Sequence, residues 1–239
     1  MEYFFIGLMA LLVITASFLQ SLIGLGYVLI VAPFLVLYDP NFVPVPMLLC
    51  GLFLPLLMIW RDHSSIDFTG LKLAIFGRVL GNFIAVWLIT IISRNTFMLV
   101  FGILVIIAVI LSESNLKFRP TPVSVCIAGL FSGIMGTLAG LGGPPMAILY
   151  QNEKGSVIRG TLSGFSILGT VLSLFFLGVA GRFTLNDLKL FSYMVPGIVA
   201  GFYLSKYAIG IVDRGYIRKV MLGVSFLAAI MVIVKTLRF

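Results

Sequence analysis

Long apolar runs separated by short polar stretches dominate this chain of 239 residues. The runs of the N-terminal part cover Tyr3–Gly24, Tyr27–Tyr38, Pro44–Trp60, Leu71–Ile92 and Thr96–Leu111. Those of the C-terminal part cover Val123–Leu141, Pro144–Gln151, Val157–Gly178, Leu188–Val212 and Tyr216–Leu237. A transmembrane helix needs about 20 apolar residues, whereas strands of a membrane barrel would alternate apolar and polar positions. The pattern therefore predicts an all-α, polytopic membrane protein.

The composition strengthens this prediction. Hydrophobic residues make up 61% of the chain and charged residues only 10%, against about 45–50% and about 25% in a typical soluble domain. So much apolar surface cannot be buried in one water-soluble core. A soluble globular domain, a disordered chain and a coiled coil are therefore excluded.

The two parts resemble each other across a polar stretch, Ser112–Pro122. Similar segments recur in the same order about 116 to 120 residues apart: Ser21–Gly26 and Thr137–Gly142, Leu71–Leu73 and Leu188–Leu190, Gly77–Gly81 and Gly197–Gly201. The pattern predicts a first membrane repeat over residues 1–112, a linker over 113–122 and a second repeat over 123–239. Duplicated membrane halves are typical of transporters.

The second element of each half is too short to span a bilayer comfortably. Tyr27–Tyr38 would be about 18 Å long as a helix and Pro144–Gln151 about 12 Å, against about 30 Å of hydrocarbon. Each follows a glycine break, at Gly24–Gly26 and at Gly140–Pro145. Glycine permits turns that other residues resist, and proline suits the first turn of a helix. We therefore expect a long-plus-short helical hairpin, broken at glycine, in each half.

The distribution of basic residues favours this hairpin path. If each hairpin returns to its starting side, one side of the membrane carries most of the bases: Arg61, Lys72, Lys117, Arg119, Lys154, Arg159, Lys206, Arg214, Arg218 and Lys219. The other side carries Arg94, Arg182, Lys189, Lys235 and Arg238. If each pair were one broken crossing, the bases would divide almost equally. The positive-inside rule favours the hairpins, with both termini outside, and five elements per half make the second repeat inverted relative to the first.

Inverted repeats bring the two glycine turns toward each other from opposite faces. Unpaired N–H groups at a helix start attract anions, and irregular backbone inside a membrane is tolerated only against protein or water. We therefore predict an anionic-substrate site at Gly24, Leu25 and Gly26 of the first turn and at Gly140, Gly142, Gly143, Pro144 and Pro145 of the second. The alternative is that these glycines only allow close helix packing.

Further polar residues lie within apolar runs. Arg78, about 9 Å into its helix, and Arg159 are candidates to hold an oxyanion through the forked guanidinium, or else they snorkel to lipid headgroups. Arg159 precedes a polar face of Thr161, Ser163, Ser166, Thr170 and Ser173. Gln20, Ser21, Thr137 and Asn82 line a path or merely bridge helices.

Other chemistries find no support. The acidic residues all lie at run ends or in loops, and HExxH, Walker and GxSxG patterns are absent. Cys50 and Cys126 form no CxxC pair. We therefore expect no catalytic residues, no metal and no cofactor. The formal net charge of +8 is assigned to anionic lipid headgroups rather than to nucleic acid; a homo-oligomer is left open.

Several of these motifs resemble those of the sulfite exporter TauE/SafE family, also called the toluene-sulfonate uptake permease family. They are Gly24-Leu-Gly26, the segment Gly133–Met146 containing Gly-Gly-Pro-Pro, Arg159-Gly-Thr161, and Phe68–Leu73 with Phe183–Leu190. The resemblance covers almost the whole chain; the first half departs from it with Tyr27-Val28 where the second has Gly143-Pro144. It implies movement of sulfur oxyanions or small organosulfur anions, often outward, across the bacterial inner membrane.

The favoured hypothesis is thus a secondary transporter, an exporter, for a small anion such as sulfite or a sulfonate, working by alternating access. Gly77, Gly81, Gly197 and Gly201 would permit close helix sliding between the halves. An anion channel with the same site and a membrane chaperone without flux are the alternatives.

Overall fold

The computed structural model describes residues 2–23, 26–61, 68–114, 120–150, 155–208 and 214–238, without the side chains of 2–6, 59–61, 68–71, 155–160, 214, 216 and 217. The helices of its first half are α1 (Glu2–Ile23), α2 (Tyr27–Tyr38), the 3-10 turn η1 (Pro40–Phe42), α3 (Val45–Arg61), α4 (Phe68–Ile91) and α5 (Arg94–Glu113). Those of the second half are α6 (Pro122–Ala139), α7 (Gly143–Tyr150), α8 (Gly155–Val179), α9 (Leu185–Ala208) and α10 (Arg214–Arg238).

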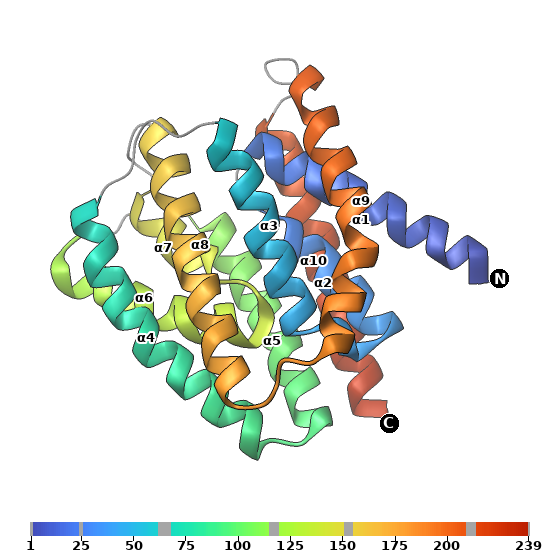
Figure 1. Ribbon diagram of the computed structural model, residues 1–239, viewed down its shortest axis with the longest axis horizontal. Coiled ribbons are helices and arrows are strands. Elements are labelled where there is room, and N and C mark those ends of the chain that lie inside the picture. Colours follow the sequence, from blue (N-terminus) through green and yellow to red (C-terminus); the bar gives the residue numbers. More distant parts are fainter. Residues whose placement is uncertain are drawn as a thin grey trace.

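The all-α prediction is confirmed, and no strand occurs in the described ranges (Figure 1). Local capping explains where several helices begin. The Ser93 hydroxyl accepts a hydrogen bond from the Thr96 N–H at 3.2 Å, so α5 begins before the apolar run. Thr121 and Ser124 form a reciprocal capping box ahead of α6, with Pro122 in its first turn. Polar side chains thus define where these helices begin, which the apolar pattern alone does not locate.

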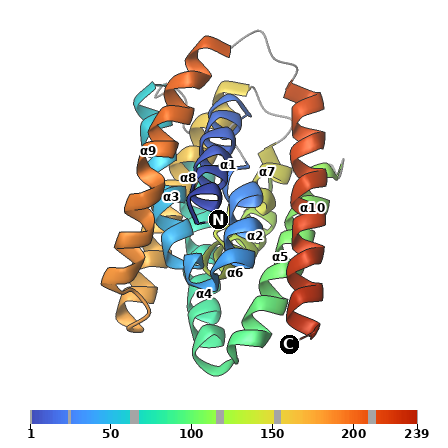
Figure 2. The same cartoon turned by 90° about the vertical axis from the view of Figure 1, so that its right-hand side faces the viewer.

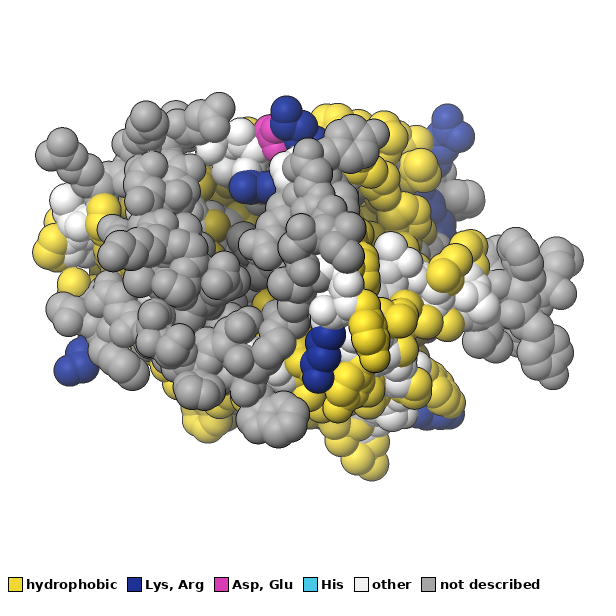
Figure 3. Space-filling model, turned by 90° about the horizontal axis from the view of Figure 1, so that it is seen from above, with side chains coloured by type: hydrophobic (Ala, Val, Ile, Leu, Met, Phe, Trp, Pro, Cys, Tyr) yellow, Lys and Arg dark blue, Asp and Glu magenta, His cyan; other side chains and the backbone are white. Residues whose placement is uncertain are grey.

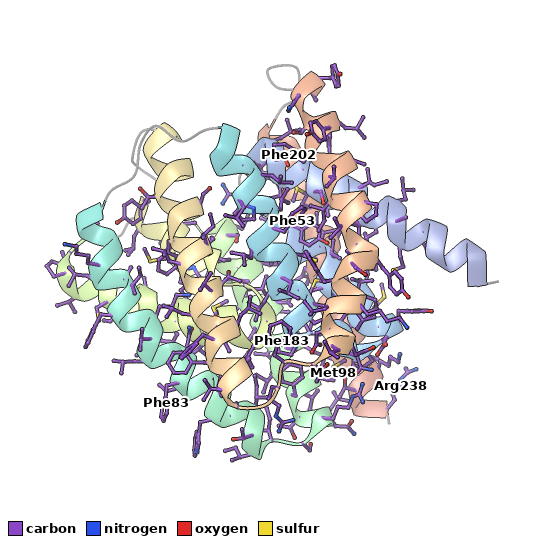
Figure 4. All side chains as sticks on the ribbon, viewed as in Figure 1. Phe53, Phe83, Met98, Phe183, Phe202 and Arg238 are labelled. Carbon is purple, nitrogen blue, oxygen red and sulfur yellow. The ribbon has the colours of Figure 1, made fainter. Side chains whose placement is uncertain are left out.

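Six helices are long and apolar enough to cross a membrane, judged on the described residues alone: those within Lys72–Ile91, Arg94–Glu113, Pro122–Ala139, Thr161–Val179, Leu185–Ala208 and Arg218–Arg238. Their outer faces carry large apolar side chains, and Phe83 in Figure 4 points away from the bundle with 63% of its surface exposed. From above, hydrophobic side chains surround much of the described perimeter (Figure 3). Such continuous apolar exposure suits a lipid environment.

The closest helix contacts join the first half to the second half. α4 of the first half packs against α6 of the second, and α9 of the second packs against α1 of the first. The contacts of α10 with α2 and of α5 with α7 form a similar pair, and α3 also meets α8. Figure 2 shows α5 and α10, which also pack together, side by side at one edge of the molecule. An inverted repeat requires paired contacts of this kind, so the pattern supports the duplication, which stays a prediction along with its boundaries.

The ends of the bundle agree with the hairpin path. Arg94 Nη2 donates to Asn41 Oδ1 at 3.3 Å, and Arg182 Nη2 donates to the Ile89 carbonyl at 3.4 Å. These bonds join the α2–α3, α4–α5 and α8–α9 connections at one end, the lower end of Figure 1. A broken crossing in each half would put the α4–α5 and α8–α9 connections at opposite ends, so the structure disfavours it.

Glycines let the backbones of α4 and α6, and those of α1 and α9, come into direct contact. A Cβ atom added at Gly77 of α4 would overlap the Cys126 carbonyl of α6, and one at Gly129 would overlap the Ala74 carbonyl. In the other pair, a Cβ at Gly201 of α9 would overlap the Ile14 carbonyl of α1. Close packing of small residues is a main source of helix association in lipid.

The α4–α6 contact predicts a sharp difference between two glycine variants. Gly77→Val should lower the apparent unfolding temperature by about 2–12 °C, because overpacking costs about 1–3 kcal/mol and the opposing carbonyl cannot move aside. Gly223→Val of α10 is the control, since nothing lies within 4 Å of an added Cβ there. Thermal unfolding in detergent, followed by size-exclusion fluorescence, measures both; equal unfolding temperatures would contradict the close contact.

Candidate functional site

The two glycine turns lie side by side in the middle of the molecule. Gly26 and Gly140 have φ angles of +125° and +72°, a region that favours glycine. An added Cβ at Gly140 would lie 3.0 Å from Cγ1 of Val28, just after the first turn. Both turns border one cavity of about 70 Å³. Since a water molecule needs roughly 10–15 Å³ of such space, the cavity has room for a few waters or a small oxyanion.

Half of the predicted site residues line this cavity: Gln20, Gly26, Arg78, Gly140, Gly142, Gly143 and Pro144. The cavity lining also includes Met58 and Ser112, in the last turns of α3 and α5, so it extends toward the end of the molecule opposite to the α4–α5 connection.

Arg78 is the charged residue of the cavity. Only 2% of its surface is exposed, and it is among the largest fully buried side chains. The snorkelling alternative for Arg78 is therefore wrong: its side chain stays inside the protein and does not reach the outer surface.

Among the described residues, the guanidinium of Arg78 has one side-chain hydrogen-bond acceptor. Nη1 donates to the Ser132 hydroxyl at 3.0 Å, and that hydroxyl in turn donates to the Gly142 carbonyl. The Phe165 ring lies against the guanidinium, with Cζ 4.7 Å from the ring centroid. Nε is buried and has no hydrogen-bond partner. Ser132 thus ties the cation to the second turn, while further donors remain for a ligand.

Three glycines make the space in which the guanidinium lies. A Cβ at Gly136 of α6 would come within 2.8 Å of Nη2, and one at Gly142 within 2.8 Å of Nη1. A Cβ at Gly169 of α8 would overlap Cζ itself. Any larger residue at these positions would displace the cation, so α6, α8 and the second turn together shape its pocket.

The positive charge of Arg78 has no described counter-charge. Among the described residues no carboxylate forms an ion pair with it, and Asp39, Glu113 and Asp187 lie at helix ends or connections. A buried unpaired ion costs several kcal/mol even after relaxation. A bound anion would remove much of this penalty and would also satisfy the donors that the protein leaves open.

The backbone contributes less than the sequence analysis expects. Pro144 and Pro145 occupy the first turn of α7 and have no N–H, so they remove donors that a helix start normally offers. In the first turn, the Tyr27 N–H donates to Gln20 Oε1 at 2.7 Å and is already satisfied. The prediction that bare peptide N–H groups form the site thus loses the donors at Tyr27, Pro144 and Pro145 and otherwise stays a prediction, while Arg78 adds a full positive charge beside both turns.

Other predicted residues lie outside the described cavity lining. Thr137 lies 3.1 Å from the side-chain amide of Asn82 and 2.9 Å from the Ser173 hydroxyl, which joins α6, α4 and α8. Ser21 Oγ donates to the Ser17 carbonyl within α1. Thr161 and Pro145 are buried outside the cavity lining. Gly24, Leu25 and the side chain of Arg159 lie outside the described residues.

The polar face of α8 does reach the cavity, through Ser163, Ser166 and Thr170. Sequence reasoning missed Ser132, Phe165 and Gly169, the residues that seat Arg78. A serine among small residues in an apolar run was the one available signal for Ser132; a phenylalanine or glycine in such a run carries none.

Comparison with family models matches residues 9–232 to a family described as "Sulfite exporter TauE/SafE". No curated protein and no solved structure matches the chain.

The contact between Gly169 and the guanidinium of Arg78 predicts that substitutions at these two positions have strongly coupled effects on stability. Gly169→Ala should destabilise the protein by at least about 1 kcal/mol, because its Cβ overlaps the guanidinium. In an Arg78→Ala background the same change should cost less than about 0.5 kcal/mol, since the space is then free. Chemical unfolding of the four proteins in detergent measures this coupling.

Gly178→Ala is the matched control, because it lies on the same helix with nothing within 4 Å of the added Cβ. It should be neutral or slightly stabilising, as alanine favours helices over glycine by about 0.5–1 kcal/mol. An equal cost of Gly169→Ala with and without Arg78 would contradict the described geometry.

Proposed function

Because the chain belongs to the sulfite exporter TauE/SafE family, we propose that it is a secondary transporter that exports small sulfur-containing anions, such as sulfite or organosulfonates, by alternating access. Family membership and the six apolar helices make it a multi-pass membrane protein of a transporter family. Three further statements are part of the proposal: that the protein lies in the bacterial inner membrane, that it moves its substrate outward, and that it works by alternating access.

The unpaired, buried guanidinium of Arg78 is the observation that supports an anionic substrate. A guanidinium presents a planar fork of N–H donors that matches two oxygens of an oxyanion. In the dry interior such a charged hydrogen bond is stronger than in water, so one cation can replace much of the anion's hydration. Gln20, whose oxygen is used by Tyr27, offers only its NH2 group to a ligand, and Ser166 and Thr170 offer hydroxyls.

The size and position of the cavity suit a substrate of few atoms. It lies between the turns of the two halves, near the middle of the molecule, where transporters with repeats bind their substrates. Its volume of about 70 Å³ suits a small oxyanion in this conformation. Movement of one half against the other, along the smooth glycine contacts at Gly77, Gly81, Gly197 and Gly201, would expose the cavity to each side in turn.

Flux in proteoliposomes tests the proposal directly. Purified protein should move labelled sulfite with saturation, and external sulfite should accelerate the exit of labelled sulfite from loaded vesicles. Arg78→Gln should reduce this flux at least about 100-fold, because it removes the charge that replaces hydration, a loss of about 2.7 kcal/mol or more. Steady current without exchange would indicate a channel, and absence of flux with every sulfur anion tried would contradict transport.

Arg78→Met distinguishes a ligand-binding arginine from a structural one. Without substrate, Arg78→Met should be as stable as the wild type or more stable, because an apolar side chain replaces an unpaired buried ion. With sulfite at 100 times its dissociation constant, only the wild type should gain about 2.7 kcal/mol of stability. Thermal unfolding with and without sulfite measures both effects; strong destabilisation of the ligand-free variant would mean that Arg78 serves the fold instead.

A Gly142→Val variant tests the second turn. The added side chain would meet Nη1 and Nη2 of Arg78, so flux should be lost while the protein still inserts into the membrane. Normal sulfite flux at normal expression would exclude Gly142 from the site.

A further inference from the structure

A second hollow lies at the end of the molecule opposite to the opening of the Arg78 cavity. It has a volume of about 440 Å³ and is lined by residues of the α2–α3, α4–α5 and α8–α9 connections. These connections come from three separate places in the sequence and meet at the lower end of Figure 1. The hollow is thus much larger than the Arg78 cavity and belongs to a different face.

Two arginines, Arg94 and Arg182, line this hollow. Each donates one described hydrogen bond, Arg94 to Asn41 and Arg182 to the Ile89 carbonyl, and this leaves other N–H groups for a ligand. The one carboxylate among the described lining residues, Asp187, accepts bonds of 2.7 Å from both the N–H and the hydroxyl of Thr184. The charged groups of the lining therefore have a positive balance, and the negative one is already bound.

A thin apolar layer separates the hollow from the Arg78 cavity. Val45, Leu48 and Leu177 form a small buried cluster between α3 and α8. Val45 lines the hollow and Leu48 lines the cavity, and these two residues of α3 are three positions, about 4.5 Å of helix rise, apart. Residues of α8 and its C-terminal connection follow the same line, with Thr170 at the cavity, Leu177 in the cluster and Arg182 at the hollow.

We propose that this hollow is a second anion site, which binds sulfonates and sulfur oxyanions between Arg94 and Arg182. Its role as a mouth of the transport path rests on the proposed function, whereas its binding of anions does not. Because both arginines are exposed, salt screens them strongly, and we expect weak binding that declines as ionic strength rises. The larger volume leaves room for the organic part of a sulfonate.

A fluorinated sulfonate tests the hollow independently of transport, and the variants distinguish the two sites. The 19F transverse relaxation of 3,3,3-trifluoropropane-1-sulfonate reports weak binding to purified protein in detergent. The relaxation rate should rise with wild-type protein and fall back when excess sulfite is added. Arg78→Gln should keep this rise, while Arg94→Gln/Arg182→Gln should lose at least about four-fifths of it. Arg94→Lys/Arg182→Lys, which keeps the charge, should retain more than half.

Lys189→Gln is the matched control for general surface charge, because Lys189 lies on α9 at the same end but outside the hollow's lining. It should leave the relaxation effect unchanged. An effect that persists in the double glutamine variant, or that falls equally in Lys189→Gln, would overturn the second site, as would no effect with the wild type. If the 19F relaxation results are as expected but neither the wild type nor any variant moves sulfite, the proposed function is overturned and the second site is not.

Discussion

A single buried cation constrains the centre of this molecule. A guanidinium inside an apolar bundle requires space, at least one acceptor and a way to offset its charge. The space comes from Gly136, Gly142 and Gly169, the acceptor is the Ser132 hydroxyl, and the Phe165 ring covers part of the ion. What the described residues lack is the opposite charge. Since a protein rarely keeps an unpaired buried ion without a reason, the missing charge points to a ligand that comes and goes.

The helices around Arg78 can approach closely because their contact faces are small. Gly77 of α4 precedes Arg78 by one residue and touches α6, so the helix that carries the cation lies backbone to backbone against the helix that carries Ser132. A side chain at Gly77 or Gly129 would push α4 and α6 apart and would move the guanidinium from its acceptor. The glycines that hold the halves together therefore also set the position of the charge.

The sequence was a good guide to the helices and a partial guide to the site. Apolar runs and glycine breaks located α2 and α7 to within a residue, because periodicity and turn chemistry are local properties. The surroundings of Arg78 are not a local property of the sequence. Ser132, Phe165 and Gly169 contact Arg78 from two other helices, and the sequence around each of them gives no sign of this contact. The prolines of the second turn show a different limit. Their missing N–H groups are harmless to the helix, yet they reduce the number of backbone donors that this turn can offer to a ligand.

Burial makes Arg78 attract an anion more strongly than the exposed Arg94 and Arg182 do. The same guanidinium group attracts an anion several times more strongly where the effective dielectric constant is low than where water surrounds it. Arg78 is therefore suited to hold an anion that has lost its water, and Arg94 and Arg182 to gather or release one that has kept it. A carrier needs both properties, because a deep site that bound equally well when open to solvent would not let its substrate go. On the proposed transport path, water that enters the Arg78 cavity would weaken the deep site at the moment of release, and the buried apolar cluster of Val45, Leu48 and Leu177 lies between that cavity and the hollow.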